Sequence, residues 1–129
     1  MAKRNAYPHA VALYAALLPG LRATAHEHGY ALGVHGSMLT DLDLIAAPWR
    51  ETASPADVLA EALREMVGGV IPPRSPMWCG RVECAPASCD HTDANPSTRA
   101  HGRLAYAIRL GPGDGGPYLD VSVMPRAGG

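Results

Sequence analysis

Apolar side chains recur along this chain with spacings that predict its secondary structure. Over residues 8–28 they recur at steps of three and four residues, the period of a helix with one buried face: Val11, Tyr14, Leu18, Leu21 and Ala25. Pro19-Gly20 interrupts this pattern, so we expect either a kink or two short helices. Gly29 follows the last apolar position and is expected to end the helix.

Two pairs of shorter apolar runs predict two β-hairpins. Residues 30–35 and 41–47 read as strands joined by a short connection, which favours antiparallel pairing, and Pro48 ends the second strand. Residues 104–110 and 118–124 read as a second pair, joined by a glycine-rich turn. The connections are too short for a crossover, so each pair is expected to form a hairpin.

A second helix is predicted after the first hairpin. Ser54 is placed as its N-cap, Pro55 as its first residue and Gly68-Gly69 as its end. The residues expected to face the core are Val58, Leu59, Ala62, Leu63 and Met66.

The order of these elements predicts an α+β fold. We expect one mixed or antiparallel sheet of four to five strands, with the two main helices on one face. The chain of 129 residues fits a single domain, residues 1–129, and residues 72–100 are expected to form an irregular insertion because they are rich in proline and polar residues. Residues 78–84 could add a short strand there.

The candidate chemistry lies in carboxylates on two of the predicted strands. Asp41 and Asp43 are two residues apart, so on a strand both side chains project from one face. Two like charges side by side are costly unless a cation or a proton offsets them, and the usual chemical reason is a divalent metal. Asp120 on the final strand would be a third ligand, and oxygen ligands of this kind suit Mg²⁺ or Mn²⁺.

Structural roles explain the same aspartates without a metal. Asp41 could end the turn while Asp43 bonds to backbone, since aspartate is common in turns. Asp120 could be an ion-pair partner of Arg103 or Arg109. His35, which precedes the turn, could be a general base, a metal ligand or the partner of a neighbouring carboxylate.

With Gly36-Ser37 ahead of them, these residues resemble the nucleotidyltransferase superfamily, whose fold is polymerase-β-like. Its hallmark is a strand ending in Gly-Ser, an Asp-x-Asp strand and a third aspartate on a later strand, matched here by Gly36, Ser37, Asp41, Asp43 and Asp120. The resemblance implies that Gly36 and Ser37 contact the phosphates of a nucleoside triphosphate and that the three aspartates hold metal. The expected activity is Mg²⁺-dependent nucleotidyl transfer to an acceptor that the sequence does not identify.

The chain departs from that family in ways that favour a second hypothesis. Only Met38, Leu39 and Thr40 separate Gly-Ser from the aspartate pair, too few for the short helix found there in the family, so the resemblance is to a reduced version. We expect no second, acceptor-binding domain within these 129 residues, and no lysine or arginine lies near the motif. The alternative is a non-catalytic phage or bacterial module that keeps a degenerate version of the fold and binds a protein partner or another copy of itself. The chain also resembles small uncharacterised phage and prophage proteins through its His-Gly-Ser, Asp-Leu-Asp-Leu, Pro-Trp and Asp-x-Ser-Val-Met-Pro segments.

Composition and charge limit the classes of binding partner and the cellular location that we expect. A net charge of −1 gives no electrostatic case for binding nucleic acid or membranes, and the apolar content of 47% excludes a mostly disordered chain. Without a clear signal sequence or membrane span, we expect a cytoplasmic protein of a bacterium or a phage-infected cell. An odd number of cysteines, three, in a compartment expected to be reducing argues against a disulfide framework. With a nearby histidine they form a candidate Zn²⁺ site with unusually loose spacing: Cys79, Cys84, Cys89 and His91.

Overall fold

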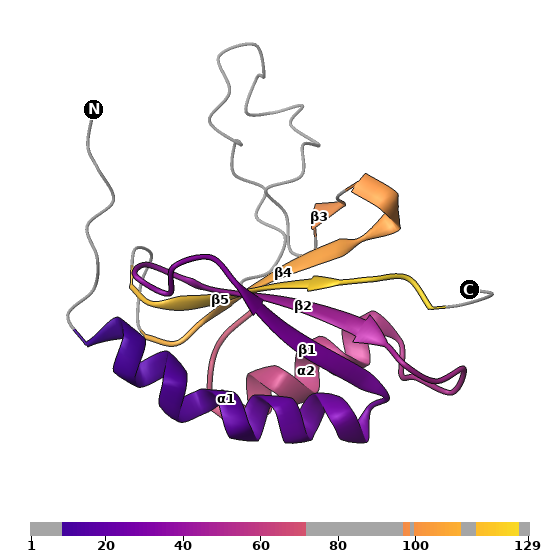
Figure 1. The fold of residues 1–129 in the computed structure, drawn as a ribbon, viewed down its shortest axis with the longest axis horizontal. Helices are drawn as coiled ribbons and strands as arrows, with labels where there is room; N and C mark the ends of the chain where they lie inside the picture. Colours follow the sequence, from indigo (N-terminus) through magenta and orange to yellow (C-terminus); the bar gives the residue numbers. More distant parts are fainter. Residues whose placement is uncertain (1–8, 72–96, 99, 112–115, 127–129) are drawn as a thin grey trace, which may run out of the picture.

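A five-stranded mixed sheet with two helices forms the fold (Figure 1). The computed structural model describes residues 9–71, 97–98, 100–111 and 116–126. The elements, in chain order, are α1 (Ala10–Glu27), β1 (Tyr30–His35), β2 (Leu42–Pro48), α2 (Ala56–Val67), β3 (Ser97–Thr98), the 3₁₀ helix η2 (Ala100–Gly102), β4 (Leu104–Arg109) and β5 (Tyr118–Val123). This architecture confirms the predicted α+β class, with both helices on one face of the sheet.

The strands lie in the order β1-β2-β5-β4-β3. Both predicted hairpins are present, since β1 pairs antiparallel with β2 and β4 pairs antiparallel with β5. The two hairpins join through the parallel contact between β2 and β5, which makes the sheet mixed. This contact places the two aspartate-bearing strands side by side.

The first helix is continuous, which rules out the two short helices that were one of the outcomes expected at Pro19-Gly20. A single helix runs from Ala10 to Glu27 with Pro19 inside it. Pro19 is exposed, so its ring lies on the solvent side, where water can reach the carbonyl that loses its hydrogen bond. Buried Tyr14 and Leu21 anchor the helix to the core on both sides of the proline.

The second helix begins one residue later than predicted, and Ser54 is not its N-cap. Pro55 holds the cap position, with no side-chain hydrogen bond. Ser54 is used elsewhere: its hydroxyl shares a 2.9 Å hydrogen bond with Nδ1 of His28, its N–H donates to the His28 carbonyl, and its own carbonyl accepts from the Tyr30 hydroxyl at 2.6 Å. These bonds tie the start of α2 to α1 and β1. Gly68 ends the helix in a left-handed conformation, as predicted.

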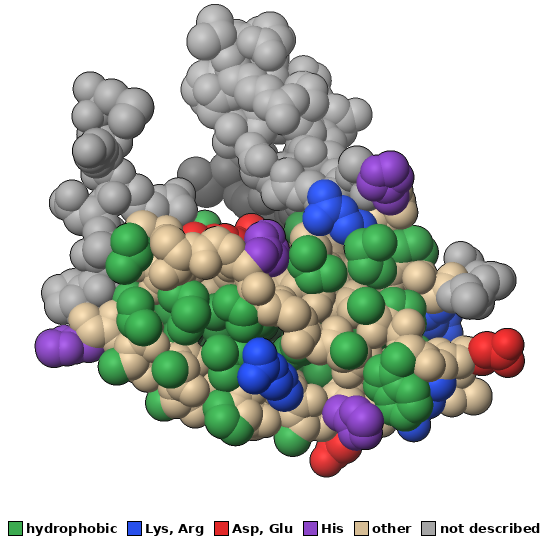
Figure 2. All heavy atoms as spheres, in the orientation of Figure 1, with side chains coloured by type: hydrophobic (Ala, Val, Ile, Leu, Met, Phe, Trp, Pro, Cys, Tyr) green, Lys and Arg blue, Asp and Glu red, His purple; other side chains and the backbone are tan. Residues whose placement is uncertain are grey.

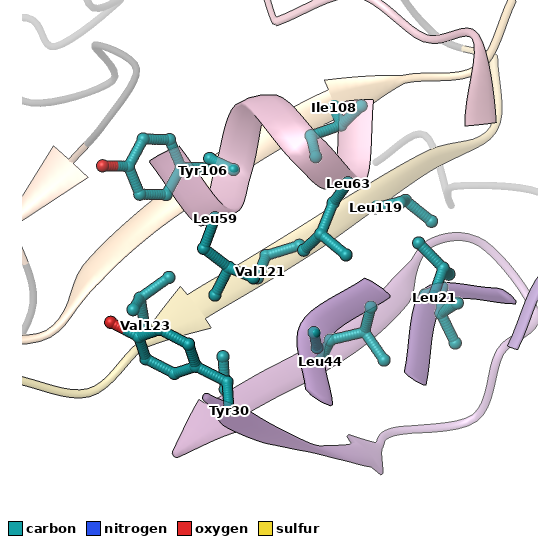
Figure 3. Packing of buried hydrophobic residues seen from close by; sticks show 14 of the residues in the cluster. Leu21, Tyr30, Leu44, Leu59, Leu63, Tyr106, Ile108, Leu119, Val121 and Val123 are labelled. Atoms are coloured by element: carbon teal, nitrogen blue, oxygen red, sulfur yellow. The ribbon is translucent and has the colours of Figure 1, made fainter. Parts of the chain in front are cut away.

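The core lies between the sheet and the helices (Figure 3). Leu44 and Val121 project from neighbouring strands toward Leu59 and Leu63 of α2. The prediction for α2 was wrong at two positions, because Val58 and Met66 are 43% and 37% exposed while Ala60 is fully buried. Helical spacing identified the buried side of α2 but not its width.

Several expectations fall outside the described residues. These are most of the insertion at 72–100, the short strand at 78–84 and the Cys79, Cys84, Cys89 and His91 set. Within the described residues, none of the helices combines the length and apolar character needed to cross a membrane.

Candidate metal centre

The sheet brings the three predicted aspartates together. Asp43 on β2 and Asp120 on β5 are direct partners in the parallel register. The residues on either side of each, Leu42 and Leu44 on β2 and Leu119 and Val121 on β5, are fully buried beneath the sheet. Because side chains alternate along a strand, both aspartates project from the opposite face, the one that the helices do not cover.

Asp41 completes the group from the end of the β1–β2 connection. One carboxylate oxygen from each of Asp41, Asp43 and Asp120 lies within 4.8 Å of the other two. All three side chains are half-buried, so the cluster is open to small ligands but partly removed from water. Three convergent carboxylates of this kind can bind a divalent metal ion.

The connection between β1 and β2 is a compact turn, and its own polar groups hold it in place. Ser37 accepts a hydrogen bond from the Leu39 N–H at 3.2 Å, so its hydroxyl stabilises the turn. The Thr40 hydroxyl donates to Oδ1 of Asp41 at 2.9 Å, and the buried Tyr14 hydroxyl donates to the Thr40 carbonyl. Helix α1 therefore orients the Asp41 carboxylate through two consecutive hydrogen bonds.

Gly36 lies directly against the Asp43 carboxylate. Its φ of +81° is in the left-handed region that favours glycine. A Cβ built at this position would lie 2.7 Å from Oδ2 of Asp43, closer than van der Waals contact allows. Glycine is therefore favoured at position 36 on two grounds, its backbone conformation and the space that the Asp43 carboxylate occupies.

The electrostatics of the cluster are those of crowded like charges. The pKa of Asp43 is raised from 3.8 to about 7, chiefly by burial and then by the hydrogen bond and negative charge of Asp41 and the charge and hydrogen bond of Asp120. Near neutral pH the cluster therefore shares a proton, and its titration belongs to the group as a whole. A divalent cation would offset the same repulsion and displace that proton.

Basic side chains also reach this face of the sheet, although none is near the motif in sequence. Nη1 of Arg103 donates to the Ser122 hydroxyl at 3.4 Å, and Ser122 lies two residues along β5 from Asp120, on the same face. Arg109 lies two residues along β4 from Ala107, the register partner of Asp120, so it projects from that face as well. Sequence reasoning considered both arginines only as ion-pair partners, because the pairing of β4 with β5 is what brings them near the aspartates.

The other predicted site residues lie near the cluster without joining it. Ser37 is exposed and bonded within the turn, and His35 is exposed and opposite Asp43 in the β1–β2 register. Trp49, which was not predicted as a site residue, lies away from the cluster beyond the other end of β2; it is 50% exposed, and its ring stacks on that of His26 with 5.0 Å between centroids. Comparison of the chain with protein-family models, curated proteins and solved structures found no match.

Proposed function

We propose that this chain binds a nucleoside triphosphate through Mg²⁺ or Mn²⁺ and acts as a reduced nucleotidyltransferase. One observation carries the proposal: Asp41 and Asp43, at the start of β2, converge with Asp120 of β5, and one carboxylate oxygen from each lies within 4.8 Å of the other two. A purely structural role for Asp43 would leave it bonded to backbone or to an arginine. Instead it lies between two other carboxylates, at a cost in electrostatic repulsion.

The geometry of the cluster fits a hard divalent cation. Oxygen ligands lie about 2.1 Å from Mg²⁺ and about 2.4 Å from Ca²⁺, so ligands on opposite sides of one ion are roughly 4–5 Å apart. The spacing of the three aspartate oxygens falls within that limit. When bound, the ion would neutralise phosphate oxygens and lower the pKa of an attacking hydroxyl.

The residues around the cluster would position the carboxylates and bind the triphosphate. Asp41 is held by Thr40, and Asp43 is backed by Gly36, so the two carboxylates are fixed before a ligand arrives. Gly36 and Ser37 are exposed at the end of β1, where backbone N–H groups can meet a phosphate. Arg103 and Arg109 add positive charge on the same face, which suits the triphosphate that the metal alone would leave partly unneutralised.

Calorimetry with Mn²⁺ and each of the common nucleoside triphosphates tests this proposal. The wild type should release heat with a triphosphate only when Mn²⁺ is present, and Asp43→Asn and Asp120→Asn should lose that heat while remaining folded by circular dichroism. Glu51→Gln is the matched control, because Glu51 is an exposed carboxylate beyond the other end of β2. Failure of the folded wild type to bind any triphosphate would overturn the proposal.

One observation favours the alternative, a non-catalytic interaction module. The turn between β1 and β2 contains no helix, and Leu39 at its tip is 50% exposed. A helix N-terminus that would otherwise bind phosphate is therefore replaced by an apolar tip. This alternative predicts that the folded wild type binds neither Mn²⁺ nor triphosphate, and that Leu39→Ser weakens binding to a protein partner instead.

A further inference from the structure

The outer face of α1 lacks the polar residues that a solvent-facing helix normally carries. From Ala10 to Leu21 the helix contains no charged residue, and its exposed positions there are all apolar: Val11, Ala12, Leu13, Ala15, Ala16 and Pro19. Val11 is 48% exposed and Leu13 39% exposed. Charged side chains appear on α1 only toward its C-terminal end, at Arg22 and Glu27, together with the polar Thr24 and His26. A helix that is apolar on both sides is normally covered on both sides.

Figure 2 shows this surface, with hydrophobic side chains gathered over α1. The strand next to α1 is β1, which packs on the helix and forms an edge of the sheet. The apolar helix face therefore continues into an open strand edge.

The β1–β2 register shows which backbone groups point out of that edge. The Trp49 N–H donates to the Gly29 carbonyl at 2.9 Å, which marks Gly29 and Trp49 as a hydrogen-bonded pair. Hydrogen-bonded and non-hydrogen-bonded pairs alternate in an antiparallel ladder, so Gly33 directs its N–H and C=O toward β2. Leu32 and Val34 direct theirs away from the sheet, where no described strand pairs with them.

The edge also lacks the features that usually prevent another strand from pairing with it. The β1 sequence Tyr-Ala-Leu-Gly-Val-His contains no proline, lysine, arginine or acidic residue. Natural edge strands are commonly protected by charges, proline or bulges. An unprotected edge beside an apolar helix has the composition of an interface.

We infer that this surface, made of the outer face of α1 and the edge of β1, pairs with the same surface of a second copy of the chain. A two-fold axis would place β1 antiparallel to its counterpart and α1 against its counterpart. Such an interface is self-complementary, because an uncharged face meets another uncharged face without repulsion. This inference is independent of the proposed function, since none of the three aspartates contributes to the surface.

The available area fits a weak dimer. The uncharged stretch Ala10–Leu21 is about 18 Å long, and a helix and a strand layer together stand roughly 20 Å high. The face therefore offers about 360 Å² per copy, or about 700 Å² in total, which is below the roughly 1,000 Å² of a stable interface and in the range of weak, reversible ones. The dimer should accordingly dissociate on dilution.

Sedimentation equilibrium of the full chain over a dilution series, with one substitution and its control, tests the inference. Ala15 lies in the middle of the apolar face, so Ala15→Lys should raise the dimer dissociation constant roughly tenfold or more, because two lysines would be buried close to each other. Val70→Lys is the control, since Val70 is 50% exposed and lies beside β4 rather than β1. Mixing Ala15→Lys with Ala15→Glu should restore dimers. A monomeric wild type at about 100 μM would overturn the inference, as would a dimer that Ala15→Lys leaves intact.

Amide hydrogen exchange tests the part of the inference that concerns the strand. The N–H groups of Leu32 and Val34 should exchange slowly in the wild-type dimer and fast in Ala15→Lys. The Gly33 N–H is the internal control, because its bond to β2 should protect it in both proteins. Fast exchange at Leu32 and Val34 in a wild-type dimer would show that β1 does not pair across the interface and would overturn the proposed geometry.

Discussion

Burial and the repulsion within the aspartate cluster both disfavour the ionised form of Asp43, so the protein should be more stable when Asp43 is neutralised. A carboxyl group whose pKa rises from 3.8 to about 7 on folding destabilises the folded state by at most about 4 kcal/mol once it is ionised, at 1.36 kcal/mol per pKa unit. Water reaches this half-buried cluster and screens its charges, so we expect an effect of about 1–2 kcal/mol. Asp43→Asn should therefore raise the free energy of unfolding by that amount at pH 8.

The difference in stability between the wild type and Asp43→Asn should depend on pH. Below the unfolded pKa of 3.8, Asp43 is protonated in both the folded and the unfolded state, so it does not lower the free energy of unfolding. As the pH rises from 3.8 through 7, Asp43 ionises in the unfolded chain before it ionises in the folded one. The free energy of unfolding of the wild type therefore falls relative to that of Asp43→Asn, and this fall is complete above pH 7. The two proteins should therefore unfold alike at pH 4 and diverge by pH 8.

Urea unfolding monitored by circular dichroism at pH 4, 6 and 8, without divalent metal, measures these differences. Glu51→Gln is the control for the loss of a carboxylate away from the cluster. Millimolar Mn²⁺ should then stabilise the wild type and Glu51→Gln but not Asp43→Asn, because the metal offsets the same repulsion. The reasoning would be refuted if Asp43→Asn were less stable than the wild type at pH 8, or if the difference did not change with pH.

Three further substitutions test the packing around the site. Gly36→Ala should cost about 1–2 kcal/mol for the left-handed backbone and also weaken Mn²⁺ binding, because its Cβ would displace the Asp43 carboxylate; unchanged calorimetric affinity would contradict this. Tyr14→Phe should cost about 1 kcal/mol in urea unfolding and weaken Mn²⁺ binding, since Thr40 would lose its bond to α1; a stability loss with full affinity would show that the hydroxyl does not position the turn. Leu63→Ala should cost about 2–5 kcal/mol in thermal or urea unfolding, yet leave Mn²⁺ affinity unchanged at temperatures where the variant is folded; a loss of affinity there would link the core to the site.

The elements could be predicted from the sequence because their signals are local. Alternation of apolar residues located the four longer strands, and glycines at 29 and 68 marked the helix ends. The errors arose where tertiary contacts override local preference. Ser54 has the side chain of an N-cap but bonds to His28 instead, and the helix of residues 10–27 continues through Pro19 because both of its halves are packed.

The site was predictable in composition but not in geometry. Nothing in the local pattern shows that the strand of Asp120 inserts beside the strand of Asp43, or that the pairing is parallel. Only the resemblance of the Gly-Ser and Asp-x-Asp segments suggested that the three aspartates meet. Arg103 and Arg109 were considered only as ion-pair partners of Asp120 for the same reason, since their distance from the motif in sequence hides their position on the shared face.

The central position of β5 has a consequence for the order of assembly. This strand follows all the other described elements in the chain, yet it lies in the middle of the sheet, between β2 and β4. During synthesis, the edge of β2 that pairs with β5 therefore remains unpaired until β5 emerges from the ribosome. The aspartate cluster cannot exist before that moment, because Asp120 arrives with the strand that completes the sheet. A nascent chain should thus be unable to capture metal until its fold has closed.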